Sequence, residues 1–439
     1  MTARKRRVLL VSYHFPPSSA VGALRAARLA TGLPEHGFIV DVLCASEDSS
    51  VESPDRSSSL RLPGEARLLR VPTPFVLGRN PSVANLPTNF LGVLFWKLRA
   101  HLEWRFLTKD WSWRWGQRAL AEVLPELESG RYEALILDGP PRPALAPFAS
   151  WGRANGVTVV TDLRDVWASE HTTFSAFSWL SPALRRSRWF HLLGEDTLAN
   201  SDHVIFNTDD MATFMKEHSS VLNDAKVSFV PNAYVSSEVD PTPPAVNIDN
   251  RALELVHTGS LSYGRHHLLI GLIEAVERWN QRQTRPLRLT LVGPRHEEVE
   301  ELIAARRLDD QIMSIGRCDR VRTIELQRKA DILVLFQPDS RVTRMATPAK
   351  TFEYMCRRKP IFALVPPGPA ATLLEETGLG VVCHAVDSGQ IESALSEVVE
   401  WTTEGRELPS LPKKYSAAET TREFAQIVHL AMSGGSSRG

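Results

Sequence analysis

Two cationic side chains lie where a helix is predicted to begin, which is the end of a helix that disfavours positive charge. Arg265 closes the small loop 259–265 (GSLSYGR), and the amphipathic pattern after it predicts a helix. Lys350 falls in the first turn of another predicted helix, for which Thr347 is a suitable N-cap and Pro348 a suitable first residue. Because the helix dipole is positive at its start, a bound anion would offset both conflicts. Together the two cations indicate a diphosphate site.

Glu353 follows Lys350 by three residues, so their side chains share one face of the predicted helix. A carboxylate beside a diphosphate site can accept hydrogen bonds from the hydroxyls of a ribose. The alternative is an ordinary surface pair of Lys350 and Glu353, which contributes about 0.2–0.5 kcal/mol, with Arg265 as a solvated cation. His266 and His267 are expected to be surface residues, because no third ligand is spaced for a metal ion.

Two loops in the first half of the chain also follow apolar runs. Residues 13–23 (YHFPPSSAVGA) contain Gly22, which would let a ligand approach the backbone closely, although on spacing alone a plain turn is favoured. Residues 161–167 (TDLRDVW) place Arg164 and Asp165 directly after a predicted strand. These charges fit a functional cleft and a structural pair that caps the next helix about equally well.

Short apolar runs alternate with helical patterns along most of the chain, and the candidate loops follow such runs. Parallel strands that are covered by helices on both faces produce this pattern, so the fold class is α/β. Ligands are then expected at the carboxyl ends of the strands. The predicted strands are residues 8–13, 40–44, 135–137, 157–161, 204–207, 253–258, 288–292, 332–336, 360–365 and 380–382.

The segment 239–250 is predicted to be a linker, because it is rich in proline and poor in large apolar residues. It separates two predicted α/β domains, residues 1–238 and 251–412. A helical pattern over 413–432 is expected to cross back to the first domain, and residues 433–439 are expected to be a disordered tail. Two such domains would face each other across one cleft.

Composition excludes several classes of protein. The 439 residues carry 51 basic and 51 acidic side chains, so the net charge is zero and nucleic acid is not an expected partner. No apolar run is long enough for a membrane-spanning helix, and the run after Arg7 is too short for a signal peptide. The four cysteines lie far apart, which argues against disulfide or zinc frameworks and fits a reducing cytoplasm.

Aromatic and basic side chains gather in residues 90–115, where the tryptophans and cations include Trp96, Trp104, Trp111, Trp113, Trp115, Lys97, Arg99, Arg105 and Arg114. Such a segment can lie at a membrane surface, with the aromatic rings among the headgroups and the cations against anionic lipid. The competing interpretation is a pair of helices packed on the first domain with partly buried tryptophans, and the pattern alone favours it somewhat.

The order of these segments resembles glycosyltransferase family 4 over nearly all of residues 7–430. The opening YHFPPSSAVGALRAARLATGLPEHGFIVDVL resembles the family's first strand, loop and helix, and LDGPPRPAL and TDLRDVWAS resemble elements of a subgroup. VPNAYV resembles the segment that closes the first domain, with Ala233 in place of glycine. HTGSLSYGR resembles the donor-phosphate loop, and ATPAKTFEYMCRRKPIFAL resembles the donor helix.

The resemblance implies a GT-B fold, in which two Rossmann-like parallel-sheet domains face a central cleft. It implies that a sugar moves from a nucleoside-diphosphate sugar to an acceptor hydroxyl with retention at the anomeric carbon, the first domain taking the acceptor and the second the donor. The donor-binding residues would be Gly22, Gly259, Ser260, Arg265, Gly293, Pro348, Lys350 and Glu353. The acceptor side would include Tyr13, His14 and Arg25, and the catalytic residues would be Arg164 and Asp165.

Family members usually need no metal, in agreement with the lack of a DxD motif here, so no cofactor is expected. The expected acceptor is a sugar or lipid-linked precursor of an envelope polysaccharide or glycolipid, met by peripheral contact at the inner face of the cell membrane. Two departures matter: Ser260 replaces a common arginine, and Met345 replaces the first glutamate of an E-x7-E pair that ends at Glu353. The alternatives are therefore a catalytically silent nucleotide-sugar-binding protein and a sugar-nucleotide epimerase.

Overall fold

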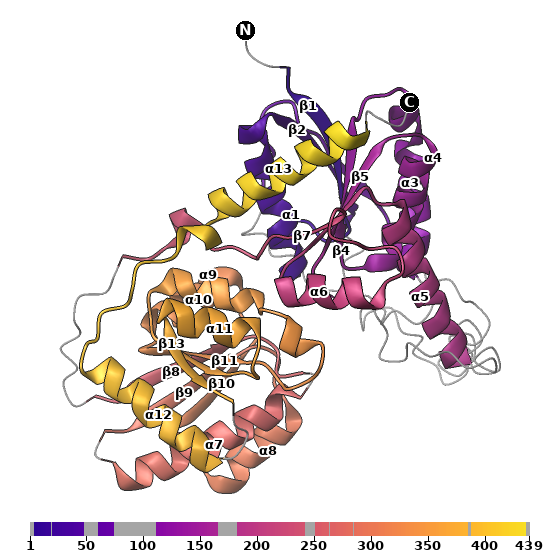
Figure 1. Cartoon of the computed structure of the whole chain (residues 1–439). Coiled ribbons are helices and arrows are strands. Elements are labelled where there is room, and N and C mark those ends of the chain that lie inside the picture. The colour runs from indigo at the N-terminus through magenta and orange to yellow at the C-terminus, as the bar shows by residue number, and fades with distance from the viewer. Residues whose placement is uncertain are drawn as a thin grey trace. The chain divides into compact units, whose positions relative to one another are not determined.

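A computed structural model divides the chain into two compact domains, and each is described by itself. The first domain comprises Met1–Val230 and Thr421–Gly439, and the second comprises Pro231–Thr420. The residues that the structure describes are 4–18, 20–47, 60–73, 111–165, 182–241, 251–262, 264–283, 285–384 and 388–435 (Figure 1).

A parallel sheet forms the centre of the first domain. Its strands are β1 (Arg6–Ser12), β2 (Phe38–Ala45), β3 (Leu68–Val71), β4 (Ala134–Gly139), β5 (Thr158–Leu163), β6 (His203–Phe206) and β7 (Val227–Phe229). They lie in the order β3-β2-β1-β4-β5-β6-β7, so the order reverses at β1, which pairs with β2 and β4. The apolar side chains of β1 are fully buried because both faces of the sheet are covered.

Helices cover both faces of this sheet (Figure 1). They are α1 (Val21–Gly32), α3 (Trp111–Glu128), α4 (Ala146–Ala154), α5 (Pro182–Asn200), α6 (Asp209–His218) and α13 (Ala417–Gly435), with 3-10 turns at Leu33–His36 and Arg142–Ala144. On one face, Phe424 and Val428 of α13 share a core with Leu29 of α1 and Leu10 of β1. Helix α4 packs beside α3 and α5 on the other face.

The second domain has a parallel sheet of its own. Its strands are β8 (Leu253–Thr258), β9 (Leu287–Val292), β10 (Ile312–Gly316), β11 (Ile332–Phe336), β12 (Ile361–Leu364) and β13 (Gly380–Cys383). They lie in the order β10-β9-β8-β11-β12-β13, so the order reverses at β8. Both sheets are therefore doubly wound, with one switch in strand order each.

Helices on the two faces of the second sheet build two separate cores. One core contains side chains of α7 (Arg265–Arg282), α8 (Glu297–Arg306) and α12 (Ser388–Thr403). The other contains side chains of α9 (Arg320–Lys329), α10 (Ala349–Arg357) and α11 (Pro369–Thr377). Figure 1 shows the same division, with α12 running along α7. Short 3-10 turns lie at Ser236–Glu238, Thr343–Met345 and Lys413–Tyr415.

All ten strands predicted from apolar runs are present, which confirms the α/β class and the two Rossmann-like parallel sheets. Three further strands, β3, β7 and β10, were not predicted. Each lies at the edge of its sheet, and β7 (VSF) has no fully buried side chain. An edge strand is covered on fewer sides, so its sequence lacks the continuous apolar run that marks an interior strand.

The domain boundary lies earlier in the chain than predicted. The second domain begins at Pro231, and Asp240 from the predicted linker pairs with Arg357 and Arg328 of that domain at 2.8 Å each. Residues 242–250 of the predicted linker lie outside the described residues. Helix α13 continues to Gly435, so the expectation of a disordered tail from residue 433 is wrong for its first three residues, and residues 436–439 lie outside the description.

Two findings concern the chain as a whole. Within the described residues, the helices are too short or too polar to span a membrane. The four cysteines are free thiols, and three of them are buried. They make no disulfide, which agrees with their wide spacing in the sequence.

Candidate active site

The carboxyl end of β8 lies at the switch in strand order of the second sheet, and several predicted donor residues surround it. β8 pairs with β9 on one side and β11 on the other. The connections that follow β8 and β11 leave toward opposite faces of the sheet. Ligands of open α/β sheets bind in the crevice between two such strands. Gly259 follows β8 directly, and Lys350 approaches it from the start of α10.

Gly259 and Gly293 allow the loops after β8 and β9 to pack closely. Gly259 has a φ of 142°, a conformation that residues with a Cβ rarely adopt. A Cβ on Gly293 would lie 1.9 Å from the carbonyl oxygen of Gly259, so a side chain cannot be placed there. The N–H of Gly259 donates to Val292, and that of Gly293 donates to Gly316. The loops therefore present main chain rather than side chains at these two positions.

Lys350 and Glu353 form a partly buried ion pair beside this loop. The Nζ of Lys350 lies 3.4 Å from Oε2 of Glu353, and its Cε lies 3.8 Å from where a Cβ on Gly259 would be. The Glu353 side chain is only 15% exposed, so the pair is not the solvated surface pair of the alternative interpretation. Burial would raise the pKa of Glu353, but Lys350 and a hydrogen bond from Gln327 outweigh it and hold that pKa below its usual value.

Gln327 and Tyr354 fix the position of Glu353 relative to β8. The amide nitrogen of Gln327, on α9, donates to Oε1 of Glu353 at 2.5 Å and to the hydroxyl of Thr258 at 3.0 Å. Tyr354 is fully buried, and its hydroxyl accepts the backbone N–H of Thr258 at 3.0 Å. Because Thr258 is the last residue of β8, these bonds join α9 and α10 to the strand end that carries the loop.

His257, next to the end of β8, is a candidate site residue that the sequence interpretation missed. Its Nδ1 lies 3.0 Å from the carbonyl oxygen of Val334, so this nitrogen carries the proton and donates. Its Nε2 is buried, makes no hydrogen bond within the described part of the chain, and lies 3.7 Å from the Cβ position of Gly259. Burial lowers the pKa of His257 to about 4, and Lys350 and Arg265 act in the same direction. The neutral ring thus offers an acceptor nitrogen beside the loop.

Arg265 is the first residue of α7, as the sequence predicts. Gly264 before it has a φ of 83°, and the Nη1 of Arg265 donates to the carbonyl of Ser262 at 3.1 Å. Ser260 is half-buried, and its hydroxyl bonds both the hydroxyl and the N–H of Ser262. The loop is thus closed by its own hydrogen bonds, with a guanidinium where the helix begins.

The starts of α7 and α10 lack the acidic side chains that offset a helix dipole. Neither first turn contains Asp or Glu, whereas α8 carries three glutamates in its first turn. Arg265 and Lys350 occupy the two starts instead. A cation at the positive end of a helix is unfavourable by itself. An anion bound between the cation and the helix start is attracted to both, so the electrostatic energy of the arrangement becomes favourable.

Helix α10 begins one residue later than predicted. Pro348 is its N-cap and Ala349 its first residue, while Thr347 is buried and is not the cap. Lys350 remains in the first turn, so the argument for an anion is unchanged. Met345, at the position of the family's first glutamate, lies in the preceding 3-10 turn and is 8% exposed. This position therefore offers no carboxylate.

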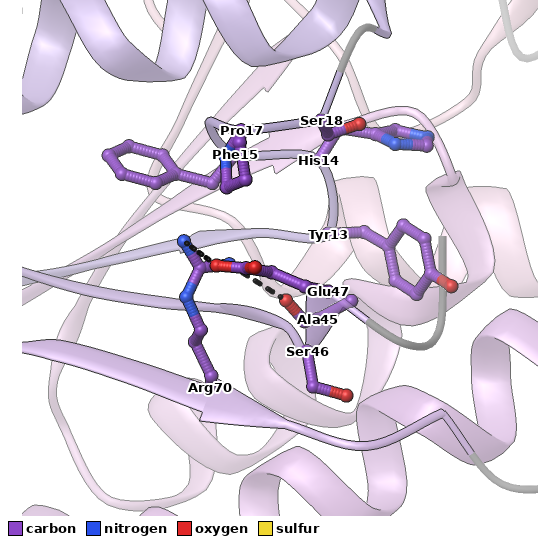
Figure 2. A pocket seen from close by; sticks show the side chains of 9 residues that line it. All are labelled: Tyr13, His14, Phe15, Pro17, Ser18, Ala45, Ser46, Glu47 and Arg70. Carbon is purple, nitrogen blue, oxygen red and sulfur yellow. Dashed lines mark hydrogen bonds and ion pairs between the residues drawn. The ribbon is translucent and has the colours of Figure 1, made fainter. Parts of the chain in front are cut away.

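In the first domain, a pocket lies at the carboxyl ends of β1 and β2 (Figure 2). Tyr13 and His14, both predicted on the acceptor side, line it together with Phe15, Pro17, Ser18, Ala45, Ser46, Glu47 and Arg70. The guanidinium of Arg70 donates to two backbone carbonyls and lies 3.6 Å from Glu47. The pocket thus combines an aromatic wall with one cation and one carboxylate.

Arg164 occupies the space that Gly22 leaves. A Cβ on Gly22 would lie 2.5 Å from Nη1 of Arg164, so this glycine makes room for the arginine side chain, and its contact with a donor stays a prediction. The Nε of Arg164 donates to the carbonyl of Gly139 at 2.8 Å, and its Nη2 lies 3.5 Å from Asp138. The side chain is 10% exposed and belongs to a buried polar network.

Asp138 ends the apolar run of β4 as a buried carboxyl. Its Oδ2 accepts the hydroxyl of Ser12 at 2.6 Å, while its Oδ1 makes no hydrogen bond among the described residues. Burial raises the pKa of Asp138 to about 6, against the opposing effect of Arg164. Burial thus favours the protonated form of this carboxyl, a property that its sequence position alone does not indicate.

Arg25 is a structural residue, which corrects the expectation that it contacts an acceptor. It is 4% exposed, and its guanidinium donates to both carboxylate oxygens of Asp162, at 2.6 and 2.8 Å. Two such bonds use the planar fork of the guanidinium and hold it inside the domain. Asp165 is exposed and immediately precedes residues 166–181, which lie outside the described residues, so its catalytic role stays a prediction.

The aromatic segment 90–115 is described only from Trp111 onward. Trp115 is fully buried, and its indole N–H donates to the carbonyl of Val71 at 3.1 Å. Trp111 and Trp115 both pack edge-on against Tyr13, with ring centroids 5.0 Å apart. The membrane interpretation is therefore wrong for Trp115. Residues 90–110, with Trp96 and Trp104, lie outside the described residues.

Comparison with known families matches most of the chain in two segments. Residues 22–233 match the model of the "Glycosyl transferase 4-like domain", and residues 246–416 match that of "Glycosyl transferases group 1". None of the curated proteins matches the sequence.

Solved structures resemble the chain over nearly its whole length. Sucrose-phosphate synthase from Thermosynechococcus elongatus is similar at 14% identity and a TM-score of 0.61, with 98% of each chain covered. HepE of Anabaena in complex with UDP, and WaaG, a glycosyltransferase involved in lipopolysaccharide biosynthesis, also share 14% identity and 98% coverage, with TM-scores of 0.57 and 0.55. At this identity the likeness shows a common fold.

Proposed function

Because this chain belongs to the family 4-like glycosyltransferases of the GT-B type, we propose that it moves a sugar from a nucleoside-diphosphate sugar to an acceptor hydroxyl. The observation that carries the proposal is the partly buried pair of Lys350 and Glu353 at the end of β8, beside Gly259 and two helix starts without acidic residues. A structural neighbour, HepE, was solved with UDP, which supports a nucleotide as the donor's leaving group.

In this proposal the donor diphosphate binds Lys350, Arg265 and the positive dipole ends at the starts of α7 and α10. Negative charge collects on the diphosphate as its bond to the sugar breaks, and cations that are already in place stabilise that charge. Ser260 contributes a hydroxyl where relatives have arginine, and Lys350 supplies the second cation. No metal ion is proposed for the transfer step.

Glu353 is the proposed partner of the donor ribose. An ionised carboxylate accepts hydrogen bonds from two neighbouring hydroxyls at once, and the lowered pKa of Glu353 keeps it ionised at neutral pH. Gln327 fixes one of its oxygens, so the carboxylate is oriented before the ligand arrives. His257 offers its unprotonated Nε2 as a further acceptor beside the same loop.

We place the acceptor in the first domain, at the pocket that Tyr13 and His14 line (Figure 2). Arg164 and Asp165 are the proposed catalytic residues, and retention at the anomeric carbon follows from the family resemblance. The proposed acceptor is a lipid-linked precursor of an envelope glycan at the inner face of the membrane, because aromatic and basic residues gather in 90–110.

Flotation with anionic liposomes tests the membrane part of this proposal. The protein should float with vesicles of anionic lipid at low salt and stay unbound at high salt, because salt screens the attraction. Replacing Lys97, Arg99 and Arg105 by Gln should weaken flotation, since each cation near the surface contributes about 1 kcal/mol. Failure of the wild type to float at low salt refutes membrane contact and leaves the transferase proposal untouched.

A transfer assay tests the reaction itself. The wild type is incubated with a panel of nucleotide sugars, with and without candidate acceptors, and nucleoside diphosphate and glycoside are quantified, with NMR to read the anomeric configuration. We expect acceptor-dependent release and a retained configuration. Binding without turnover would indicate a silent binding protein, and conversion of the donor sugar without acceptor would indicate an epimerase.

A further inference from the structure

Three potential metal ligands meet where the starts of α7 and α8 come together. His266 and His267 lie in the first turn of α7, and Glu298 lies in the first turn of α8. One ligand atom from each of them lies within 4.8 Å of the other two. The structure thus supplies the third ligand whose absence from the local sequence led us to expect two ordinary surface histidines. The third ligand could not be found from local spacing, because Glu298 belongs to the next helix.

The imidazole rings in this cluster are packed but incompletely hydrogen-bonded. His266 lies between His267 and His296, with ring centroids at 3.9 and 4.2 Å, and its ring is nearly parallel to that of His296. The Nδ1 atoms of His266 and His296 are buried and make no hydrogen bond to any described residue. The other ring nitrogen of His266, Nε2, is the one that faces the carboxylate of Glu298.

The distances fit a tetrahedral metal ion. Zinc binds imidazole nitrogen and carboxylate oxygen at about 2.0–2.2 Å, so two ligands of one tetrahedral ion lie about 3.4 Å apart. The Nε2 of His266 lies 3.4 Å from Oε2 of Glu298. The ligand atom of His267 lies within 4.8 Å of those of His266 and Glu298. Because His267 is exposed, a change of rotamer can bring this atom closer to the other two. His266 is the more fixed ligand, with a side chain that is 16% exposed.

We propose that His266, His267 and Glu298 bind one divalent transition-metal ion, with Zn²⁺ as the best fit and water as the fourth ligand. Two imidazoles and one carboxylate match the ligands that zinc accepts, whereas Mg²⁺ and Ca²⁺ prefer oxygen alone. The ion joins the first turn of α7 to that of α8. Because α7 begins directly after the loop 259–264, the ion also holds the helix start to which that loop is attached.

An ordinary histidine–glutamate pair elsewhere in the second domain serves as a control. The Nε2 of His384 lies 4.0 Å from Oε1 of Glu375, and both side chains are about half exposed. No third ligand group accompanies that pair among the described clusters. If the proximity of one histidine and one carboxylate were enough to bind zinc, both pairs would bind it. A loss of zinc binding in variants of the first pair but not of the second therefore distinguishes a metal site from an ordinary surface contact.

Competition with a chromophoric zinc chelator measures the site directly in the full chain. The wild type and His384→Gln should each bind one equivalent of Zn²⁺ with the same affinity, whereas His267→Ala and Glu298→Gln should each bind at least tenfold more weakly. Substitution of Co²⁺ gives a second readout, because tetrahedral coordination produces intense visible absorption that the two ligand variants should lose. Both variants change exposed side chains, so folding is expected to be kept.

The proposal is overturned if the wild type binds zinc no more tightly than Glu298→Gln and His267→Ala do. It is equally overturned if His384→Gln reduces binding as much as the ligand variants. Neither outcome depends on a nucleotide sugar, so failure here does not affect the proposed transferase function. Conversely, a protein without transferase activity would still show the cobalt absorption if the site exists.

Discussion

Acid is expected to destabilise the second domain through His257. Burial lowers the pKa of this group from 6.5 to about 4 in the folded protein. Below pH 6.5 the unfolded chain therefore takes up a proton at His257 while the folded protein does not, until the pH approaches 4. The stability that depends on the neutral ring is fully present above pH 6.5 and is lost as the pH falls toward 4.

The size of the effect follows from the shift. The difference between a pKa of 6.5 and a pKa of about 4 corresponds to about 3 kcal/mol in total, and at pH 5 the loss of stability should reach about 2 kcal/mol. His257→Asn removes the titration and keeps an amide N–H for the carbonyl of Val334. Urea unfolding of both proteins at pH 7 and pH 5 should show that the wild type loses about 2 kcal/mol more than the variant.

A direct reading of the imidazole complements the unfolding data. NMR titration of ¹³C-labelled histidine should show one ring that stays neutral down to about pH 4, and its signal should be missing from His257→Asn. His384→Asn, an exposed histidine of the same domain, should lose stability with acid as the wild type does. Equal losses for the wild type and His257→Asn between pH 7 and pH 5 would refute the reasoning.

Three further predictions concern other contacts. Glu353→Gln should weaken nucleoside-diphosphate binding about tenfold in calorimetry, and it should also lower the melting temperature without ligand, because the ion pair with Lys350 is lost; unchanged affinity would argue against its contact with the ribose. Gly293→Ala should lower the free energy of unfolding of the second domain by about 1–3 kcal/mol in urea, because its Cβ would lie 1.9 Å from a carbonyl oxygen. Gly156→Ala should lower the free energy of unfolding by less, because a Cβ there would have open space. Because the pKa of Asp138 is raised to about 6, the stability that its protonated form contributes to the first domain should be lost as the pH rises from 4 through 6, and the difference in stability between the wild type and Asp138→Asn should change over this range. Parallel pH profiles for the two proteins would contradict the assignment of that titration to Asp138.

The sequence predicted the interior strands and the helix starts, because both depend on the pattern of neighbouring residues. The interior strands were found because both faces of each are buried, and Arg265 and Lys350 were placed at helix starts because glycine, proline and periodicity mark such starts. The edge strand β7 was missed because it has no continuous apolar run. The start of α10 differed by one residue, since Thr347 is buried and leaves the cap to Pro348.

Contacts between distant segments were beyond prediction from one sequence. Arg25 was assigned to an acceptor, but its partner, Asp162, lies 137 residues further along the chain. His257 looked like part of a strand, and only the fold shows that its Nε2 has no hydrogen-bonding partner among the described residues.

Affinity for nucleoside diphosphates tests the central claim that the end of β8 binds the donor. Isothermal titration of UDP, GDP and ADP is compared for the wild type, Lys350→Ala and Lys329→Ala, the last an exposed lysine at the end of α9. Loss of a charge-assisted contact of about 1.5–3 kcal/mol should weaken binding of the preferred nucleotide ten- to a hundredfold in Lys350→Ala only. Binding by Lys350→Ala that equals that of the wild type would contradict the account.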